Sequence, residues 1–165
     1  MRRLARIAPG GVLARERLLL AGRRDDPLHE AVETLTKGPE HRLPAGHSFT
    51  DTHGKVREHA RIAWWRGGAR TWREAAISVG DPDALPDQPL PDGVAFEFYP
   101  EGEKPVFFGH YWMTGMPEIE APNALCLDYS AGIGDNPLVA YAGEPGACGL
   151  TLEAIIGAPA VVRNG

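Results

Sequence analysis

The sequence predicts an α+β fold, because its pattern changes twice along the chain. Apolar residues recur at helical spacing in residues 12–37, residues 49–65 show strand and turn patterns, and residues 105–141 contain short apolar runs separated by turn-forming residues. The 165 residues can bury one core, and 43% hydrophobic with 24% charged residues is typical of a folded domain. We therefore expect one domain with helices first and short strands after them.

The first region predicts two short helices. Asp25 and Asp26 can cap a helix whose first turn contains Pro27, and Gly38 followed by Pro39 can end it.

The middle region predicts a β-hairpin followed by irregular structure. A turn signal at residues 51–54 precedes alternating residues that would share one face of a strand, namely Val56, Glu58, Ala60, Ile62 and Trp64. The next segment, "TWREAAISV", fits either a helical turn or a strand. Residues 80–104 are rich in proline and acidic residues and predict a long loop.

The third region predicts three strands, in "PVFFGH", "NALCLDYS" and "PLVAY". Val106, Phe107 and Phe108 predict a strand buried on both faces, and Gly109 would allow a sharp turn at its end. His110 would then lie at the carboxyl edge of a sheet, where ligands gather in open α/β sheets.

Composition excludes several classes of function. The net charge of −5 disfavours nucleic-acid binding, and no stretch approaches the roughly 20 apolar residues of a membrane span. Two cysteines, Cys126 and Cys148, are too few for a disulfide framework and predict a reducing compartment, the cytoplasm, with Cys126 a free buried thiol. The arginine-rich start has too short an apolar stretch for an export signal.

Several short motifs, taken in order, suggest a family. Gly109-His110 ends one strand, residues 123–128 form a strand that begins with Asn123 and ends at Asp128, and residues 138–141 form a last strand. This order resembles the carboxyl-terminal end of calcineurin-like metallophosphoesterases, the family of serine/threonine protein phosphatases and diadenosine tetraphosphatases. The upstream segments 27–40, 43–55 and 61–65 resemble an insertion found in one bacterial branch of these enzymes. The resemblance therefore covers residues 12–141.

The resemblance implies a specific fold and domain plan. It implies the carboxyl-terminal half of a metallophosphoesterase β-sandwich, with flanking helices, two amino-terminal helices and a β-hairpin insertion. Residues 1–141 would form a partial phosphoesterase domain whose insertion spans about 38–104. Residues 142–165 would be a weakly structured tail.

The resemblance also implies a metal site that this chain does not complete. The family's two-metal cage uses Asp-x-His, Gly-Asp-x-x-Asp and Gly-Asn-His motifs upstream of Gly-His, and the sequence offers only "DTH" at residues 51–53, in a predicted hairpin turn. His110 is therefore the single expected metal ligand, for manganese, iron or zinc in the complete enzyme, and we expect no metal stably bound by this chain. Asp128, Asn123 and Arg61 are expected beside the metal or the substrate phosphate.

Simpler interpretations remain open for each of these residues. His110 could be a histidine whose ring is satisfied by a backbone carbonyl. Trp64 and Trp65 could stack on a base or sugar, although one buried and one rim indole is the commoner arrangement. The remaining histidines singled out by their spacing are more typical of a solvated scatter than of a metal site; they are His41, His47, His53 and His59.

Two functional hypotheses follow from the sequence. The first is a fragment of a metal-dependent phosphoesterase, inactive alone, whose complete form would hydrolyse a phosphate ester. The second is a non-catalytic binding module derived from that fold. As a fragment, the chain would expose an apolar sheet face and self-associate through it.

Overall fold

The computed structural model describes residues 12, 14–51, 54–95, 98–144, 146 and 149–158. Small sheets and four α-helices make up these residues, which confirms the mixed α+β class. The chain divides into two units, Met1–Glu40 and His41–Gly165. None of the helices in the described ranges combines the length and the apolar character needed to cross a membrane.

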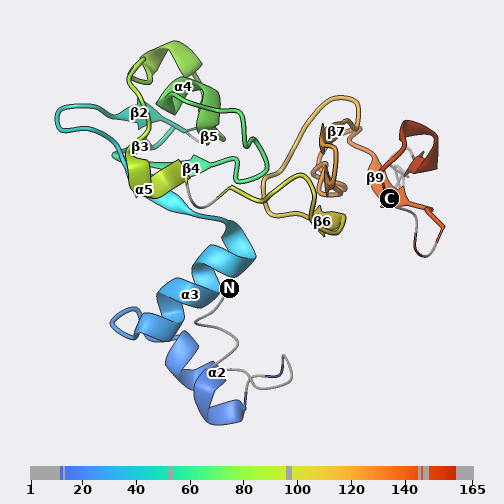
Figure 1. The fold of residues 1–165 in the computed structure, drawn as a ribbon, viewed down its shortest axis with the longest axis horizontal. Helices are drawn as coiled ribbons and strands as arrows, with labels where there is room; N and C mark the ends of the chain where they lie inside the picture. Colours follow the sequence, from blue (N-terminus) through green and yellow to red (C-terminus); the bar gives the residue numbers. More distant parts are fainter. Residues whose placement is uncertain are drawn as a thin grey trace. The chain divides into compact units, whose positions relative to one another are not determined.

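The first unit contains the two short helices that the sequence predicted (Figure 1, blue). They are α2 (Arg15–Ala21) and α3 (Pro27–Lys37). The Asp26 carboxylate accepts a hydrogen bond from the Leu28 backbone N–H at 2.8 Å, and Pro27 is the first residue of α3. Gly38 ends α3 with a φ of 80°, a conformation that glycine adopts without strain.

The second unit begins with a three-stranded sheet and a separate hairpin. The sheet has the order β1 (Glu40–Arg42), β4 (His59–Ile62), β5 (Ala76–Ile77), and the hairpin pairs β2 (Phe49–Thr50) with β3 (Val56–Arg57). The predicted hairpin is confirmed, since Phe49 lies opposite Arg57.

The predicted alternating face is correct only in part. Ala60 and Ile62 are fully buried, whereas Val56 is 71% exposed. The chain departs from strand geometry at Glu58, between β3 and β4, so the two strands belong to different pairs and share no single face.

The segment "TWREAAISV", for which the sequence allowed a helical turn or a strand, contains both in succession. Helix α4 (Trp72–Ala75) begins at a capping box, in which the Thr71 side chain accepts from the Glu74 N–H and the Glu74 side chain accepts from the Thr71 N–H. Strand β5 follows directly.

The acidic, proline-rich segment packs against the core of this region. It contains the 3₁₀ helix η2 (Pro82–Ala84) and helix α5 (Asp92–Ala95). Leu85 and Val94 are buried in one cluster with Phe49, Ile62 and Trp72. The long predicted loop is therefore ordered by apolar side chains that alternate with its acidic ones.

A second three-stranded sheet carries the Gly-His motif. Its order is β6 (Val106–Phe108), β8 (Ala124–Cys126), β7 (Ile119–Ala121), with β6 parallel and β7 antiparallel to β8. All three residues of β8 are buried, but Phe107 is 45% exposed. The prediction that β6 is buried on both faces is wrong, because β6 is an edge strand and the central position belongs to β8.

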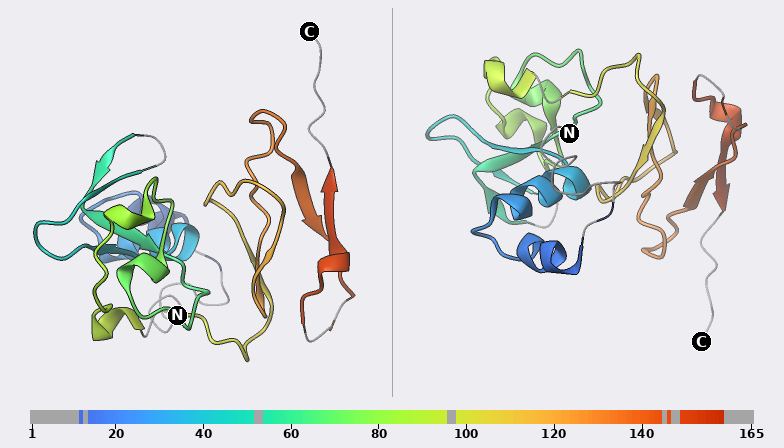
Figure 2. Two further views of the ribbon diagram at one scale, coloured as in Figure 1. Left: turned by 90° about the horizontal axis from the view of Figure 1, so that it is seen from above. Right: turned by 60° about the horizontal axis from the view of Figure 1, so that its bottom comes forward.

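The last two strands form an antiparallel pair (Figure 2, orange to red). Strand β9 (Leu138–Tyr141) is the predicted final strand, and β10 (Ile155–Ala158) pairs with it after the 3₁₀ helix η3 (Leu152–Ala154). The sequence predicted only weak structure after Tyr141, yet the four residues of β10 are in register with all four of β9.

Candidate functional site

The parallel pairing of β6 and β8 brings the Gly-His motif and Asp128 to the same edge of the sheet. Phe108 and Cys126 are register partners, so residues 109–110 and 127–128 leave the sheet side by side. The His110 backbone N–H donates to the Asp128 carboxylate, with 2.8 Å between N and Oδ2, and the Ser130 N–H donates to Oδ1 at 3.2 Å. The expected position of His110 at a carboxyl edge is confirmed, with Asp128 beside its backbone.

Gly109 eases the close approach of the two chain segments. A Cβ atom at residue 109 would lie 3.1 Å from the Asp128 Cβ, closer than side chains normally pack. The sequence predicted a sharp turn at Gly109, and the residue with a positive φ is the next one, His110, at 79°. Glycine therefore serves close packing here and leaves the strained conformation to the histidine.

Backbone strain is concentrated around this edge. Four non-glycine residues in the described ranges have positive φ, and three of them follow β6 or β8: His110, Trp112 at 52° and Ser130 at 58°. The left-handed conformation costs a non-glycine residue about 1–2 kcal/mol. Strain of this kind accumulates at functional sites because selection retains the side chain there.

Hydrogen bonds hold the two strained segments together. The Met113 N–H donates to the Asp128 carbonyl oxygen at 2.9 Å, and the Ser130 hydroxyl donates to the Met113 carbonyl oxygen at 3.2 Å. The segment after β6 is therefore bonded to the segment after β8 through both backbone and side chain.

An aromatic cluster lies behind His110. Tyr111 is buried, and its hydroxyl accepts a hydrogen bond from Trp64 Nε1 at 3.0 Å. Burial raises the pKa of Tyr111 to about 12, against a smaller opposite effect of the Trp64 hydrogen bond. Trp65 stacks on Phe108 with 4.3 Å between ring centroids and is 1% exposed. The predicted arrangement of one buried and one partly exposed indole is confirmed.

Arg61 and Asn123 differ in their relation to this edge. Arg61 lies in β4 opposite Ile77 of β5, and its charge is a minor influence that lowers the pKa of Tyr111. Asn123 lies at the opposite end of β8. Its amide donates to the carbonyl oxygens of Pro100 at 2.8 Å and Glu103 at 3.0 Å, so it orders the turn before β6 and does not join His110 and Asp128.

The residues at this edge do not by themselves fit a metal centre. No group of three histidine, cysteine or carboxylate side chains gathers anywhere in the described part of the chain. His110 offers one imidazole and Asp128 one carboxylate, so this edge brings together two side chains that could bind a metal. The histidine of "DTH", His53, lies outside the described residues, as does Cys148.

The other cysteine behaves as the sequence predicted. Cys126 is a free, fully buried thiol, and burial raises its pKa to about 11. It is therefore a packing residue under the sheet edge and not a nucleophile.

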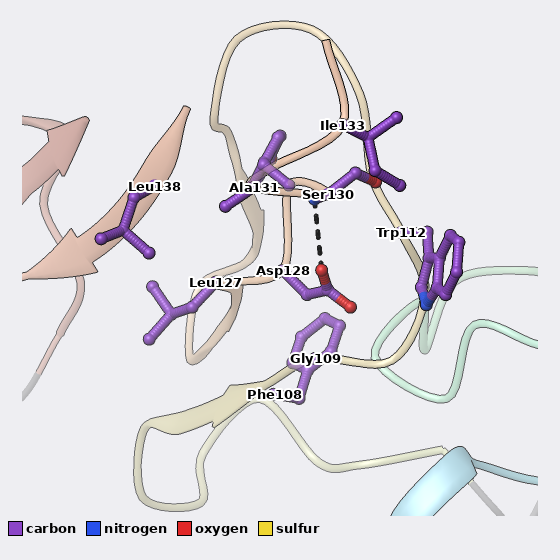
Figure 3. A pocket seen from close by; sticks show the side chains of 10 residues that line it. Phe108, Gly109, Trp112, Leu127, Asp128, Ser130, Ala131, Ile133 and Leu138 are labelled. Atoms are coloured by element: carbon purple, nitrogen blue, oxygen red, sulfur yellow. Dashed lines mark hydrogen bonds between the residues drawn. The ribbon is translucent and has the colours of Figure 1, made fainter. Parts of the chain in front are cut away.

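A hollow of about 520 Å³ opens beside the same edge (Figure 3). Asp128 lies in its wall between Phe108 and Ser130, and its carboxylate points toward the side formed by Trp112. Trp112 and Ser130, which line this hollow, were not predicted as site residues. A signal was available for Trp112, since an aromatic residue two positions after a strand-terminal histidine would be placed at the same edge.

We compared the chain with protein-family models, with curated proteins and with solved structures, and found no match to any of them.

Proposed function

We propose that this chain is the His110-bearing part of a metal-dependent phosphoesterase and that it requires further metal ligands from residues outside it. The observation that carries the proposal is the junction of β6 and β8. Parallel strands deliver Gly109-His110 and Asp128 to one sheet edge, and the carboxylate fixes the backbone of the histidine. This matches the order of motifs in the calcineurin-like family that the sequence resembles.

The role assigned to His110 is that of one nitrogen ligand. His110 is exposed at the edge, and its backbone is fixed by Asp128 on one side and by the buried Tyr111 on the other. These contacts position the Cα atom from which the imidazole extends. Phosphoester hydrolysis at two metal ions needs several ligands, so the chain alone is expected to be inactive.

The test restores the missing ligands. The amino-terminal half of a calcineurin-like phosphoesterase would be fused before Met1, and the hydrolysis of p-nitrophenyl phosphate would be followed against manganese concentration. We expect manganese-dependent turnover by the fusion and background rates for the 165-residue chain. His110→Ala in the fusion should lower metal affinity or turnover on the order of 10- to 100-fold.

His59→Ala is the matched control, because His59 is also exposed but lies in β4. Its curve should equal that of the parent fusion. Equal curves for His110→Ala and the parent would overturn the role of His110, and turnover by the unfused chain that His110→Ala abolishes would overturn the need for other ligands.

A second candidate function is a binding module without catalysis. The observation that favours it is the hollow beside Asp128 together with the lack of a three-ligand group among the described residues. An inactive but well-folded fusion would favour this function.

A further inference from the structure

The hollow beside the sheet edge is an open depression whose volume is that of a small-molecule site. Its volume of about 520 Å³ is within the range of roughly 300–1,000 Å³ that ligand pockets occupy. Apolar side chains form most of its wall, with a carboxylate on one side; the apolar ones used below are Phe108, Trp112, Leu127, Ile133 and Leu138.

Three side chains in this wall are exposed although they are large and apolar. Trp112 is 54% exposed, Ile133 53% and Leu138 63%. Figure 3 shows Trp112 on one side of Asp128, with Leu127 and Leu138 on the other. A flat ring placed between them would contact the indole face and bury apolar surface on its opposite side.

The charge of the wall selects the kind of ring. Asp128 places a carboxylate in the hollow, which disfavours an anion there. Each of its oxygens accepts one backbone N–H, and a carboxylate has about four acceptor positions, so it can still accept from an O–H or N–H donor. An uncharged aromatic group that carries such a donor satisfies both the apolar wall and the carboxylate.

Backbone strain supplies an independent observation. Trp112 and Ser130, which line the hollow, have positive φ, as does His110 next to its wall. The chain therefore presents an exposed indole from a conformation that favours glycine.

We propose that this hollow binds the aromatic leaving group of an aryl phosphate ester, with the ring on Trp112 and a second ring hydroxyl, distinct from the ester oxygen, on Asp128. The phosphate would stay outside the hollow, because the carboxylate disfavours an anion within it. The phosphate half of this assignment rests on the proposed function, whereas binding of the ring needs no metal and no catalysis.

The experiment uses the 165-residue chain and three uncharged probes in a titration followed by NMR. Phenol has the ring and the donor, cyclohexanol has the donor without the aromatic ring, and anisole has the ring without the donor. We expect phenol to shift the indole N–H signal of Trp112, assigned with Trp112→Phe, and to bind about 3- to 10-fold more tightly than the other two.

Variants locate the site. Trp112→Ala should weaken phenol binding about 2- to 10-fold, and Trp112→Phe should retain most of the affinity. Met116→Ala is the control, because Met116 is 83% exposed and does not line the hollow. Ile133→Ala in the same wall is a second variant, which serves as the test should Trp112→Ala lose its folded spectrum. We expect it to weaken phenol binding about 2-fold or more.

Equal affinity for phenol and cyclohexanol, or an unchanged affinity in both Trp112→Ala and Ile133→Ala, would overturn the proposal. Phenol binding to a chain whose fusion remains inactive would leave the ring site in place and overturn the proposed function instead. An active fusion that hydrolyses 4-hydroxyphenyl phosphate and methyl phosphate with equal efficiency, without phenol binding, would leave the proposed function in place and overturn the ring site.

Discussion

The β2–β3 hairpin and the edge formed by β6 and β8 each depend on one aspartate that orders a turn. In the hairpin, the Asp51 carboxylate accepts from the Lys55 N–H and from Arg57 Nε, both at 2.9 Å. At the sheet edge, Asp128 accepts from the His110 and Ser130 N–H groups. The two regions thus use the same capping chemistry in different backbones.

The difference lies in which residues take positive φ. In the hairpin, Gly54 has a φ of 78°, which glycine adopts at little cost. At the sheet edge His110, Trp112 and Ser130 take positive φ, although glycine would relieve the strain at each position. The hairpin turn follows the local rule, whereas the sheet edge departs from it at three residues, and this departure marks the edge as the candidate site.

The largest difference should appear when the two aspartates are removed. Asp128→Ala deprives the His110 and Ser130 backbone N–H groups of their acceptor, so we expect a loss of about 2–3 kcal/mol in the free energy of unfolding. Asp51→Ala should cost about 1 kcal/mol, because its partners Lys55 and Arg57 are exposed and can bond to water. Urea denaturation followed by circular dichroism measures both; equal losses would contradict the comparison.

The sequence predicted the elements whose signals are local. The capped helix from Pro27, the hairpin after Phe49 and the strand that ends before Gly109 all carry their own turn or cap residues, and the structure contains each of them. Burial was harder to predict, because it depends on strand order. Phe107 is exposed since β6 is an edge strand, and nothing within "PVFFGH" reveals its position in the sheet.

The candidate site was predicted in the same incomplete way. His110 and Asp128 follow strands, so their meeting at one edge could be expected from a parallel pairing. Asn123 precedes strand β8 and Asp128 follows it, so the direction of the strand places the two residues at its opposite ends. The Trp64 contact with Tyr111 joins residues 47 positions apart, which no pattern within either segment encodes.

The buried Tyr111 that contacts Trp64 should make the free energy of unfolding depend on pH above 10. Burial raises the pKa of Tyr111 from 10.0 to about 12, so between these values the unfolded chain releases the proton while the folded chain retains it. The folded state then binds more protons, and the free energy of unfolding falls as the pH rises from 10 to 12. We expect Tyr111 to account for about 1–2 kcal/mol of this fall, since 1.36 kcal/mol corresponds to each pKa unit and burial is incomplete.

Tyr111→Phe removes the titrating group and should flatten the fall by that amount, measured by urea denaturation at each pH. Between pH 7 and 9 the tyrosine is neutral in both states, so the variant and the parent should show parallel curves there. If the free energy of unfolding of Tyr111→Phe and of the parent also fell in parallel above pH 10, Tyr111 would be solvated in the folded chain. The sheet edge would then have no buried tyrosine to anchor it and would not differ from the hairpin in that respect.

The smallest expected effect tests the strain at His110 directly. His110→Ala and His110→Gly both remove the imidazole, and both keep the backbone N–H that donates to Asp128. Alanine still pays about 1–2 kcal/mol at a φ of 79°, whereas glycine avoids that strain and loses about 0.5–1 kcal/mol through its more flexible unfolded state. We therefore expect His110→Gly to unfold at a free energy about 0.5–1 kcal/mol higher than His110→Ala, the reverse of their usual order. Gly54→Ala in the hairpin should lose a similar amount. A glycine variant less stable than the alanine variant would mean that residue 110 is not held left-handed, and the sheet edge would then resemble the hairpin in following local rules.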